Sequence, residues 1–253
     1  MTVLLDAQSI SISFGGLKAV QDVSFSIEEG EVFSIVGPNG AGKTTIFNLI
    51  SRIYDCSDGS IFFKDQDITL VQTHRVAELG IARTFQNTEL FEKETVLNNL
   101  LIGCHVRRKT HFLQEIIFSS AVRKQELEFR ESVESVIDLL DLQAYREQVV
   151  GNLSYGARKM VEVARALCTR PKLLLLDEPS SGLNPEETED LAFWIEDINE
   201  ELGITIIMVE HDMKLVASVS DRVMAMADGQ LLLIGTPQEV QEDPEVLRAY
   251  LGD

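Results

Sequence analysis

The sequence predicts an α/β fold with a mixed sheet core, an N-terminal antiparallel β subdomain and an inserted helical subdomain. Three observations lead to this prediction. The first residues alternate polar and apolar side chains, as half-buried strands do. Later apolar runs are separated by a helical stretch, as in a parallel sheet. Between residues 86 and 154, helical periodicity dominates and strand signals are few.

The size and composition fit one globular domain. The chain has 253 residues, of which 45% are hydrophobic, so it can bury a large core. We expect a single domain over residues 1–253. Within it, about 1–86 and 160–253 form the core and about 87–159 form the helical subdomain.

The charge of the chain argues against a nucleic-acid partner. There are 22 basic and 41 acidic residues, and the formal net charge of -19 would repel a phosphate backbone. The longest apolar runs, such as Leu173 to Leu176, are far shorter than the ~20 residues of a membrane-spanning helix. We therefore expect neither nucleic-acid binding nor a transmembrane segment.

The termini and cysteines indicate a reducing compartment. Met1 to Asp6 has no basic start followed by a hydrophobic block, so no secretory signal is expected. Cys56, Cys104 and Cys168 are odd in number and widely separated, which fits neither a disulfide framework nor a metal cluster. The cytosol is the simplest location for these residues.

The first elements form an antiparallel unit that leads into a buried strand. Ser9 to Phe14 and Val23 to Ile27 both show the period of two. Acidic residues and Gly30 then turn the chain into Val32 to Val36, which is apolar except for Ser34.

A βαβ unit and a hairpin are expected in the second half. Leu173 to Leu176 and Ile204 to Val209 are strand-like, and the stretch between them, Glu186 to Glu201, is helical. A hairpin follows. Its strands are Val223 to Ala227 and Leu231 to Ile234, around Asp228-Gly229-Gln230. The last segment, Pro237 to Leu251, is expected to be helical.

The central insert shows its clearest helical period from Val133 through Leu142. It also contains a basic cluster, Arg107-Arg108-Lys109. The cluster is followed by apolar residues, namely Phe112, Leu113, Ile116, Ile117 and Phe118. A helix with one buried face is favoured over a dedicated binding surface.

A phosphate-binding loop directly follows the buried strand. Its residues are Gly37, Pro38, Asn39, Gly40, Ala41, Gly42, Lys43, Thr44 and Thr45. The spacing G-x-x-x-x-G-K-T lets backbone N–H groups turn toward an anion, and side chains at Gly40 and Gly42 would block this turn. Lys43 can reach the β and γ phosphates, and the Thr44 hydroxyl can ligate magnesium.

Two other apolar runs end in reactive side chains. Because ligands bind beyond the carboxyl ends of parallel strands, these residues should converge on the phosphate loop. Asp177 is expected to hold magnesium, and Glu178 to orient or deprotonate the attacking water. His211 follows the third run and is a candidate for a γ-phosphate contact. The alternatives are solvated acids at a strand end and a surface or capping histidine.

Ser154 precedes a helical pattern that runs to about Leu167. It is an excellent helix N-cap, and capping alone would explain it. A helix N-terminus that carries Ser154 and Gly156 can also bind an anion.

Together these motifs resemble the ATP-binding subunit of an ABC transporter, in the expected order over nearly the whole chain. The matching segments are Gly37 to Thr45 (Walker A), Gln86 within Arg83 to Gln86 (Q-loop), Leu153 to Gly156 (signature), Leu173 to Glu178 (Walker B with the catalytic glutamate), Ser181 to Asn184 (D-loop) and His211 (switch histidine). The resemblance implies a P-loop ABC-type ATPase that uses ATP and Mg²⁺. Thr44, Gln86 and Asp177 would hold the metal, and Glu178, His211 and Gln86 would act in catalysis.

The resemblance also implies a dimer. Each ATP would lie between the Walker A loop of one subunit and Ser154 and Gly156 of the other. Both a homodimer and a heterodimer with a sister ATP-binding subunit fit.

In detail the chain is similar to the ATP-binding proteins of branched-chain, or hydrophobic, amino-acid importers. The supporting stretches are Phe14 to Ala19, Arg83 to Gln86, Tyr155 in the signature, Glu210 to Met213, Gly235 to Pro237 and Ala249 to Gly252. This similarity implies integral-membrane permease partners, an indirect link to a solute-binding protein, and a peripheral position on the cytoplasmic face of the inner membrane. Alternatives are urea or amide import, lipopolysaccharide export and a soluble ABC ATPase.

Some positions depart from the general ABC pattern. Tyr155 and Asn184 replace the usual glycine and aspartate but fit the amino-acid importers, and Ala157 stands where glutamine is common. Phe14 occupies the position of an aromatic that stacks on adenine. Because Ile10, Ile12 and Phe14 share one strand face, core packing is the alternative for Phe14.

Overall fold

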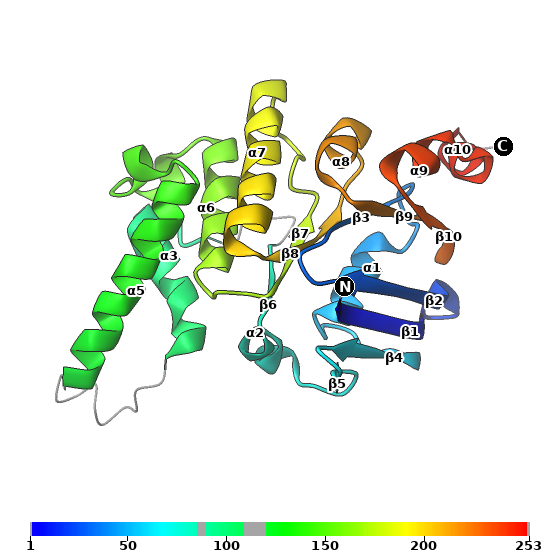
Figure 1. Cartoon of the computed structure of the whole chain (residues 1–253), viewed down its shortest axis with the longest axis horizontal. Helices are drawn as coiled ribbons and strands as arrows, with labels where there is room; N and C mark the ends of the chain where they lie inside the picture. The colour runs from blue at the N-terminus through cyan, green and yellow to red at the C-terminus, as the bar shows by residue number, and fades with distance from the viewer. Residues whose placement is uncertain (1, 85–89, 109–119, 252–253) are drawn as a thin grey trace.

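Two β-sheets organise the chain in the computed structural model, which describes residues 2–84, 90–108 and 120–251 (Figure 1). The first sheet has four strands in the order β2-β1-β4-β5, and the second has six in the order β10-β9-β3-β8-β7-β6. The strands are β1 (Val3–Phe14), β2 (Leu17–Glu28), β3 (Val32–Val36), β4 (Asp58–Phe63), β5 (Gln66–Asp67), β6 (Ile81–Arg83), β7 (Leu173–Asp177), β8 (Thr205–Val209), β9 (Arg222–Ala227) and β10 (Gln230–Gly235).

Helices surround the six-stranded sheet. They are α1 (Lys43–Ile50), α2 (Val76–Leu79), α3 (Val96–Gly103), α5 (Ser120–Leu139), α6 (Tyr155–Leu167), α7 (Pro185–Leu202), α8 (Met213–Val219), α9 (Pro237–Glu242) and α10 (Pro244–Leu251). Short 3₁₀ turns are η1 (Thr73–Arg75), η2 (Cys104–Arg107), η3 (Gln143–Tyr145) and η4 (Val150–Asn152). The expected mixed sheet core is confirmed, because β10 is antiparallel to β9 whereas β9, β3, β8, β7 and β6 run parallel.

Strands β3, β7 and β8 are buried on both faces, which explains their mainly apolar sequences. In β7, Leu173 and Leu175 pack into one apolar cluster, and Leu174 and Leu176 pack into the other. The first cluster also contains residues of α1 and of the antiparallel sheet, and the second contains residues of α6, α7 and α8. Figure 1 shows the same layers, with α7 and α8 above the sheet and α1 and β1 below it.

The antiparallel subdomain is confirmed and is larger than expected. Strands β1 and β2 each have 12 residues, and β4 and β5 extend their sheet. The sequence pattern did not identify β4, β5 or the short β6. Gly30, at φ 82°, forms the predicted turn into β3.

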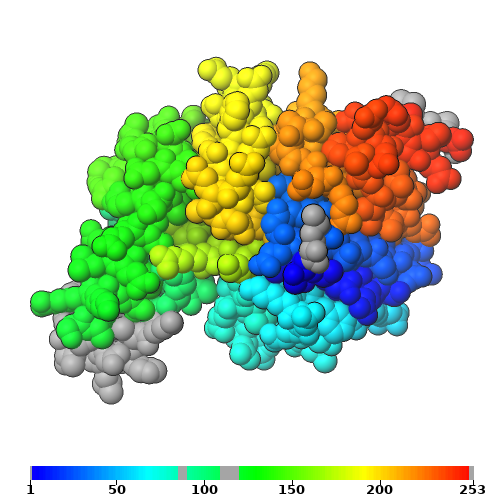
Figure 2. All heavy atoms as spheres, in the orientation of Figure 1, coloured from blue at the N-terminus to red at the C-terminus, as the bar shows by residue number. Residues whose placement is uncertain are grey.

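The helical region forms a lobe beside the core, drawn in green in Figure 2. Helix α5 ends at Leu139, so the expected helix through Leu142 is three residues too long. The chain turns there, with Asp141 at φ 52°. Helix α6 runs across the expected domain boundary near residue 159, and that division of the chain stays a prediction.

Part of the basic cluster packs inside this lobe. Arg107 donates from Nη1 to the Ser132 hydroxyl (3.2 Å) and to the Cys168 carbonyl (3.1 Å), and its guanidinium lies 5.2 Å from the centre of the Phe129 ring. This agrees with the structural interpretation for Arg107. Lys109 and the apolar residues after it lie outside the described residues.

The predicted hairpin is confirmed, and the last helical segment consists of two helices. Asp228 and Gly229 both have positive φ, at 48° and 76°, as the two-residue turns favoured between antiparallel strands require. The expected helical structure over 237–251 is confirmed as two helices, because Asp243 is extended and separates α9 from α10. Pro244 disfavours a helical conformation at the residue before it, so the chain breaks there.

Other expectations concern membrane spans and cysteines. Within residues 2–84, 90–108 and 120–251, no helix has the length and apolarity needed to span a bilayer. Cys56, Cys104 and Cys168 are free thiols. Among these described residues, no group of three or more His, Cys, Asp or Glu side chains is arranged to hold a metal ion.

Candidate functional site

The phosphate loop connects β3 to α1, and its glycines have distinct reasons to be glycine. A Cβ on Gly37 would lie 2.2 Å from the Met226 carbonyl oxygen, and one on Gly42 would lie 2.5 Å from the Ala19 carbonyl oxygen. A Cβ on Gly40 would meet nothing within 4 Å, but its φ of 85° is one that other residues rarely adopt. Gly42, at φ 99°, is therefore required for both space and conformation, and Gly40 for conformation alone.

Lys43 lies inside the loop. It is 7% exposed, and its ammonium donates to the carbonyl oxygens of Gly37 (2.7 Å) and Pro38 (3.1 Å). Burial lowers the pKa of Lys43, while the nearby carboxylates of Glu178 and Asp177 act in the opposite direction. A cation held this way faces the position where the loop would place an anion.

The loop borders a cavity of about 450 Å³. The lining residues are Gly16, Leu17, Lys18, Ala19, Gln21, Asn39, Gly40, Ala41, Gly42, Lys43, Thr44, Thr45, Glu178 and Asp228. The structure thus brings Glu178 next to the phosphate loop, 133 residues away from Thr45 in sequence. Asp228, predicted only as a turn residue, also lines the cavity.

The three strand ends lie side by side as expected, but of Asp177, Glu178 and His211 only Glu178 lines the cavity. Strands β3, β8 and β7 are neighbours in the sheet. Beyond their ends, the Glu178 amide donates to the Val209 carbonyl (2.9 Å), and the Glu210 amide donates to the Ile35 carbonyl (3.2 Å). These bonds fix the backbone that follows each strand.

Asp177 lies at the end of β7 and forms a buried ion pair. Its Oδ2 is 2.8 Å from Nη2 of Arg83, and the two side chains are 3% and 8% exposed. Arg83 also donates from Nη1 to Asn48 on α1 (2.7 Å). Sequence reasoning placed Arg83 in a motif but missed this partner. The signal was weak, since it depends on the three-residue strand β6 lying beside β7.

Glu178 has a backbone conformation that is rare for its residue type, with φ at 48°. Its carbonyl oxygen accepts a hydrogen bond from Nζ of Lys159 at 2.7 Å. Lys159 belongs to α6 and is only 6% exposed. Sequence reasoning missed this residue, although a lysine amid the apolar positions of α6 was a possible signal.

Glu210 is another residue for which sequence reasoning predicted no role. It is fully buried, and its carboxylate accepts hydrogen bonds from the backbone amides of Ser180 (2.8 Å), His211 (2.8 Å) and Asp212 (3.2 Å). It therefore joins the segments that follow β7 and β8. The His211 side chain is 60% exposed, with Nδ1 3.7 Å from Glu210 Oε2, and it does not line the cavity.

Ser154 is the N-cap of α6, as expected. Its hydroxyl accepts from the Ala157 amide at 3.2 Å, and the residue is exposed. Gly156 is buried, and a Cβ there would lie 2.4 Å from Glu187 Oε1. Neither Ser154 nor Gly156 lines the cavity that contains Lys43.

The remaining site predictions have mixed outcomes. Phe14 is 43% exposed although Ile10 and Ile12 are buried, so core packing does not hold it. Its ring lies edge-on to Tyr54, with centroids 5.0 Å apart. Its role beside adenine stays a prediction, and Gln86 lies outside the described residues.

Comparison with known proteins identifies the family. A family model described as ABC transporter matches residues 20–181. The chain belongs to the ABC transporter family. A second model, described as branched-chain amino acid ATP-binding cassette transporter, matches residues 230–253 at the carboxyl end.

Individual relatives of this ABC protein are similar to it in sequence along its whole length. It is 39% identical to the high-affinity branched-chain amino acid transport ATP-binding protein BraF of Pseudomonas aeruginosa over 250 residues, which cover 99% of this chain and 98% of BraF. The corresponding protein LivG of Escherichia coli is 37% identical with the same coverage. A crystal structure of an ATP-binding cassette of an ABC transporter in its ADP conformation has a TM-score of 0.87 and 32% identity, with both chains fully covered.

Membership in the family confirms the predicted fold and the predicted activity. The chain is an ABC-type ATPase that binds ATP and hydrolyses it.

Proposed function

We propose that this ATPase powers the import of branched-chain or other hydrophobic amino acids and that it is located on the cytoplasmic face of the cell membrane. Its full-length similarity to BraF and LivG and the match at residues 230–253 support this substrate class. The observation that supports the chemistry is the cavity that brings Lys43, Thr44 and Glu178 together. Urea or amide import and lipopolysaccharide export are the competing functions.

Within the cavity, the loop amides and Lys43 bind the phosphates of ATP. The Thr44 hydroxyl and the Asp177 carboxylate, with Gln86, are the oxygen donors proposed for Mg²⁺. Hard oxygen ligands suit this cation. In the structure, the Asp177 carboxylate is paired with the Arg83 guanidinium. When bound, the metal supplies positive charge to the β and γ phosphates.

Glu178 is proposed to position the attacking water and to accept its proton. It lines the cavity beside Lys43 and Thr44. His211 is proposed to stabilise charge that develops on the γ-phosphate. Its exposure is consistent with action after a second subunit closes over the site, and Glu210 fixes the backbone from which it extends.

A second subunit completes each site in this proposal. Ser154 and Gly156 lie at the N-terminus of α6, where backbone N–H groups and the helix dipole favour an anion. Because they do not line the cavity of their own chain, we assign them to the ATP of the partner subunit. ATP binding closes the dimer, and hydrolysis reopens it. The partner is a second copy or a sister ATP-binding subunit.

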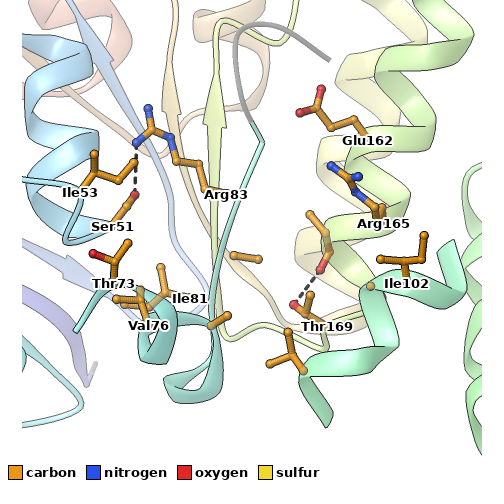
Figure 3. Close-up of a pocket in the computed structure, with 15 residues that line it drawn as sticks. Ser51, Ile53, Thr73, Val76, Ile81, Arg83, Ile102, Glu162, Arg165 and Thr169 are labelled. Atoms are coloured by element: carbon orange, nitrogen blue, oxygen red, sulfur yellow. Dashed lines mark hydrogen bonds between the residues drawn. The ribbon is translucent and has the colours of Figure 1, made fainter. Parts of the chain in front are cut away.

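The permease contact is proposed at a groove of about 360 Å³ between the core and the helical lobe (Figure 3). Figure 3 shows Ile53, Val76 and Ile81 on one side and Ile102 on the other, with Glu162 and Arg165 extending from α6. Arg83 also lines this groove and contacts Asp177, so it connects the groove to the nucleotide site.

Cross-linking tests the permease contact. Val106 lines the groove and is 42% exposed, whereas Leu90 and Phe91 follow the Q-loop segment outside the groove, and Phe91 is 54% exposed. A cysteine at position 90, 91 or 106 should form a cross-link to a cytoplasmic permease loop in the intact complex. A cysteine at Phe193, which is 64% exposed on α7, should not. Equal cross-linking at all four positions would contradict the assignment.

Transport assays test the substrate class. The complex should be purified with its permeases and solute-binding protein and reconstituted in lipid vesicles. We expect ATP-dependent uptake of radiolabelled leucine and no uptake of urea. Uptake of urea without leucine, or release of lipopolysaccharide, would replace the proposed substrate.

A further inference from the structure

We propose that Lys159 is a positioning residue that holds the backbone of Glu178 and thereby links the signature end of α6 to the water-activating residue of the same chain. This inference rests on the roles proposed above for Glu178 and Ser154. In a closed dimer those two residues act on different ATP molecules, so Lys159 would connect the two nucleotide sites.

The first step is the set of contacts that Lys159 makes. Its Nζ donates to the carbonyl oxygens of Glu178 (2.7 Å) and Pro179 (3.0 Å), and it lies 5.6 Å from the centre of the Tyr155 ring. The side chain is only 6% exposed. A buried ammonium is costly unless its hydrogen bonds are satisfied, so this arrangement is strongly specified.

The second step concerns why Glu178 needs support. A non-glycine residue at φ 48° is in a sparsely populated conformation, and the surrounding structure must hold it there. The Glu178 amide donates to the Val209 carbonyl, and its carbonyl oxygen accepts from the Ser181 amide (3.1 Å) and from Lys159 Nζ (2.7 Å). Removing Lys159 takes away the charged and shorter of the two hydrogen bonds to this carbonyl and leaves only the Ser181 amide.

Charge around Lys159 is consistent with this role. Burial lowers the pKa of the Lys159 ammonium, and the carboxylates of Glu210, Glu162, Glu178 and Asp177 counteract that effect. The ammonium thus lies among the acids that follow β7 and β8.

The third step is the packing at the start of α6. A Cβ on Gly182 would lie 2.8 Å from Cε1 of Tyr155, and one on Gly156 would lie 2.4 Å from Glu187 Oε1. The first turn of α6 therefore packs directly against the segment from Gly182 to Glu187. Because of this packing and the Lys159 hydrogen bonds, a displacement of Ser154 also displaces the backbone of Glu178.

The test uses the purified transporter complex with Lys159→Met and Lys159→Arg. We expect Lys159→Met to lower maximal ATP turnover by about 100-fold, the loss typical of a reacting group displaced by an ångström, with unchanged ATP affinity. The Hill coefficient for ATP should fall toward one. Lys159→Arg should restore most of the turnover, because a guanidinium can donate to both carbonyl oxygens.

The matched control is Arg107→Met. Arg107 also donates to a backbone carbonyl of this helix region, at Cys168 beyond the other end of α6. Its loss should lower the melting temperature without changing the Hill coefficient. If Lys159→Met does not fold, Lys159→Gln provides the same comparison with a single amide donor. Normal turnover and cooperativity in a folded Lys159→Met or Lys159→Gln variant would overturn the inference.

A double-mutant comparison separates this inference from the proposed function. If Lys159 acts through Glu178, Lys159→Met should add little further loss in a Glu178→Gln background. Equal losses in both backgrounds would refute the link. Normal turnover in Glu178→Gln alone would instead refute the proposed role of Glu178. Normal turnover in Lys159→Met beside an inactive Glu178→Gln would refute only the role of Lys159.

Discussion

Arg83 and Asp177 form a buried ion pair at the adjacent ends of β6 and β7, with Nη2 of Arg83 2.8 Å from Oδ2 of Asp177. Arg83 also contacts Asn48 on α1 and lines the groove proposed for the permease. One side chain therefore connects the candidate metal ligand, the helix after the phosphate loop and the contact surface. A displacement at any of these places can therefore alter the position of Asp177 through its contact with Arg83.

The ion pair gives the first prediction. Arg83→Met should lower the free energy of unfolding by about 3–5 kcal/mol, because it leaves the Asp177 carboxylate buried without its partner. Mg-ATP should raise the melting temperature of this variant more than that of the unmodified protein, since the metal would replace the missing charge. Thermal unfolding with and without Mg-ATP measures both effects.

Arg146→Met is the control for that experiment. Arg146 pairs with Glu134, but these side chains are 34% and 41% exposed, so the loss should be much smaller than that of Arg83→Met. Equal losses in the two variants would show that the pair between Arg83 and Asp177 has no special stabilising role.

The glycines of the phosphate loop give a second prediction. Gly42→Ala should destabilise the protein even without nucleotide, because its Cβ would overlap the Ala19 carbonyl oxygen. Gly40→Ala should lower the free energy of unfolding by only about 1 kcal/mol, since the added Cβ meets no neighbour and the cost comes mainly from the positive φ at this position. Denaturant unfolding of both variants, followed by ATP titration, distinguishes them. Matching unfolding curves would contradict the steric argument.

The third prediction concerns Glu178. Glu178→Gln should lower ATP turnover by about 10²–10⁴-fold, the usual contribution of a general base. An ATP-bound dimer should accumulate, which size-exclusion chromatography with light scattering can detect. Glu201→Gln, at an exposed position near the end of α7, should leave turnover unchanged. A Glu178→Gln variant with full turnover would remove this residue from catalysis.

These results show which parts of the fold the sequence made predictable. The boundaries of β3 follow from its apolar run, and those of β7 and β8 nearly do, because strands buried on both faces leave little ambiguity. Short strands on the periphery were missed. Strand β6 has only three residues, and β5 only two, so neither shows a period.

Errors at helix ends have local causes. The helical prediction for residues 237–251 did not specify the break at Asp243, although Pro244 disfavours a helical conformation at the residue before it. The end of α5 at Leu139 was hidden because Leu140 and Leu142 are buried and continue the apolar pattern beyond the helix.

The site was predictable where chemistry is local in sequence. The phosphate loop and the acids after β7 are contiguous motifs, so their residue types could be assigned directly. Arg83 and Lys159 act on Asp177 and Glu178 across 94 and 19 residues. Such pairs depend on strand order and helix packing, which one sequence does not specify.

The last prediction separates the two possible roles of Ser154. Its hydroxyl caps α6 by accepting from the Ala157 amide, so Ser154→Ala should cost about 1 kcal/mol of stability. Thr236→Ala removes the equivalent cap of α9, where Thr236 accepts from the Glu239 amide, and should cost a similar amount.

Only Ser154→Ala should also weaken ATP-driven dimerisation, because only this cap is proposed to contact the nucleotide of the partner subunit. Dimer formation should be measured by light scattering with ATP in a Glu178→Gln background, which slows hydrolysis. Equal dimerisation in the two cap variants would show that Ser154 is a helix cap and nothing more. The proposed composite site would then lose the residue that closes it.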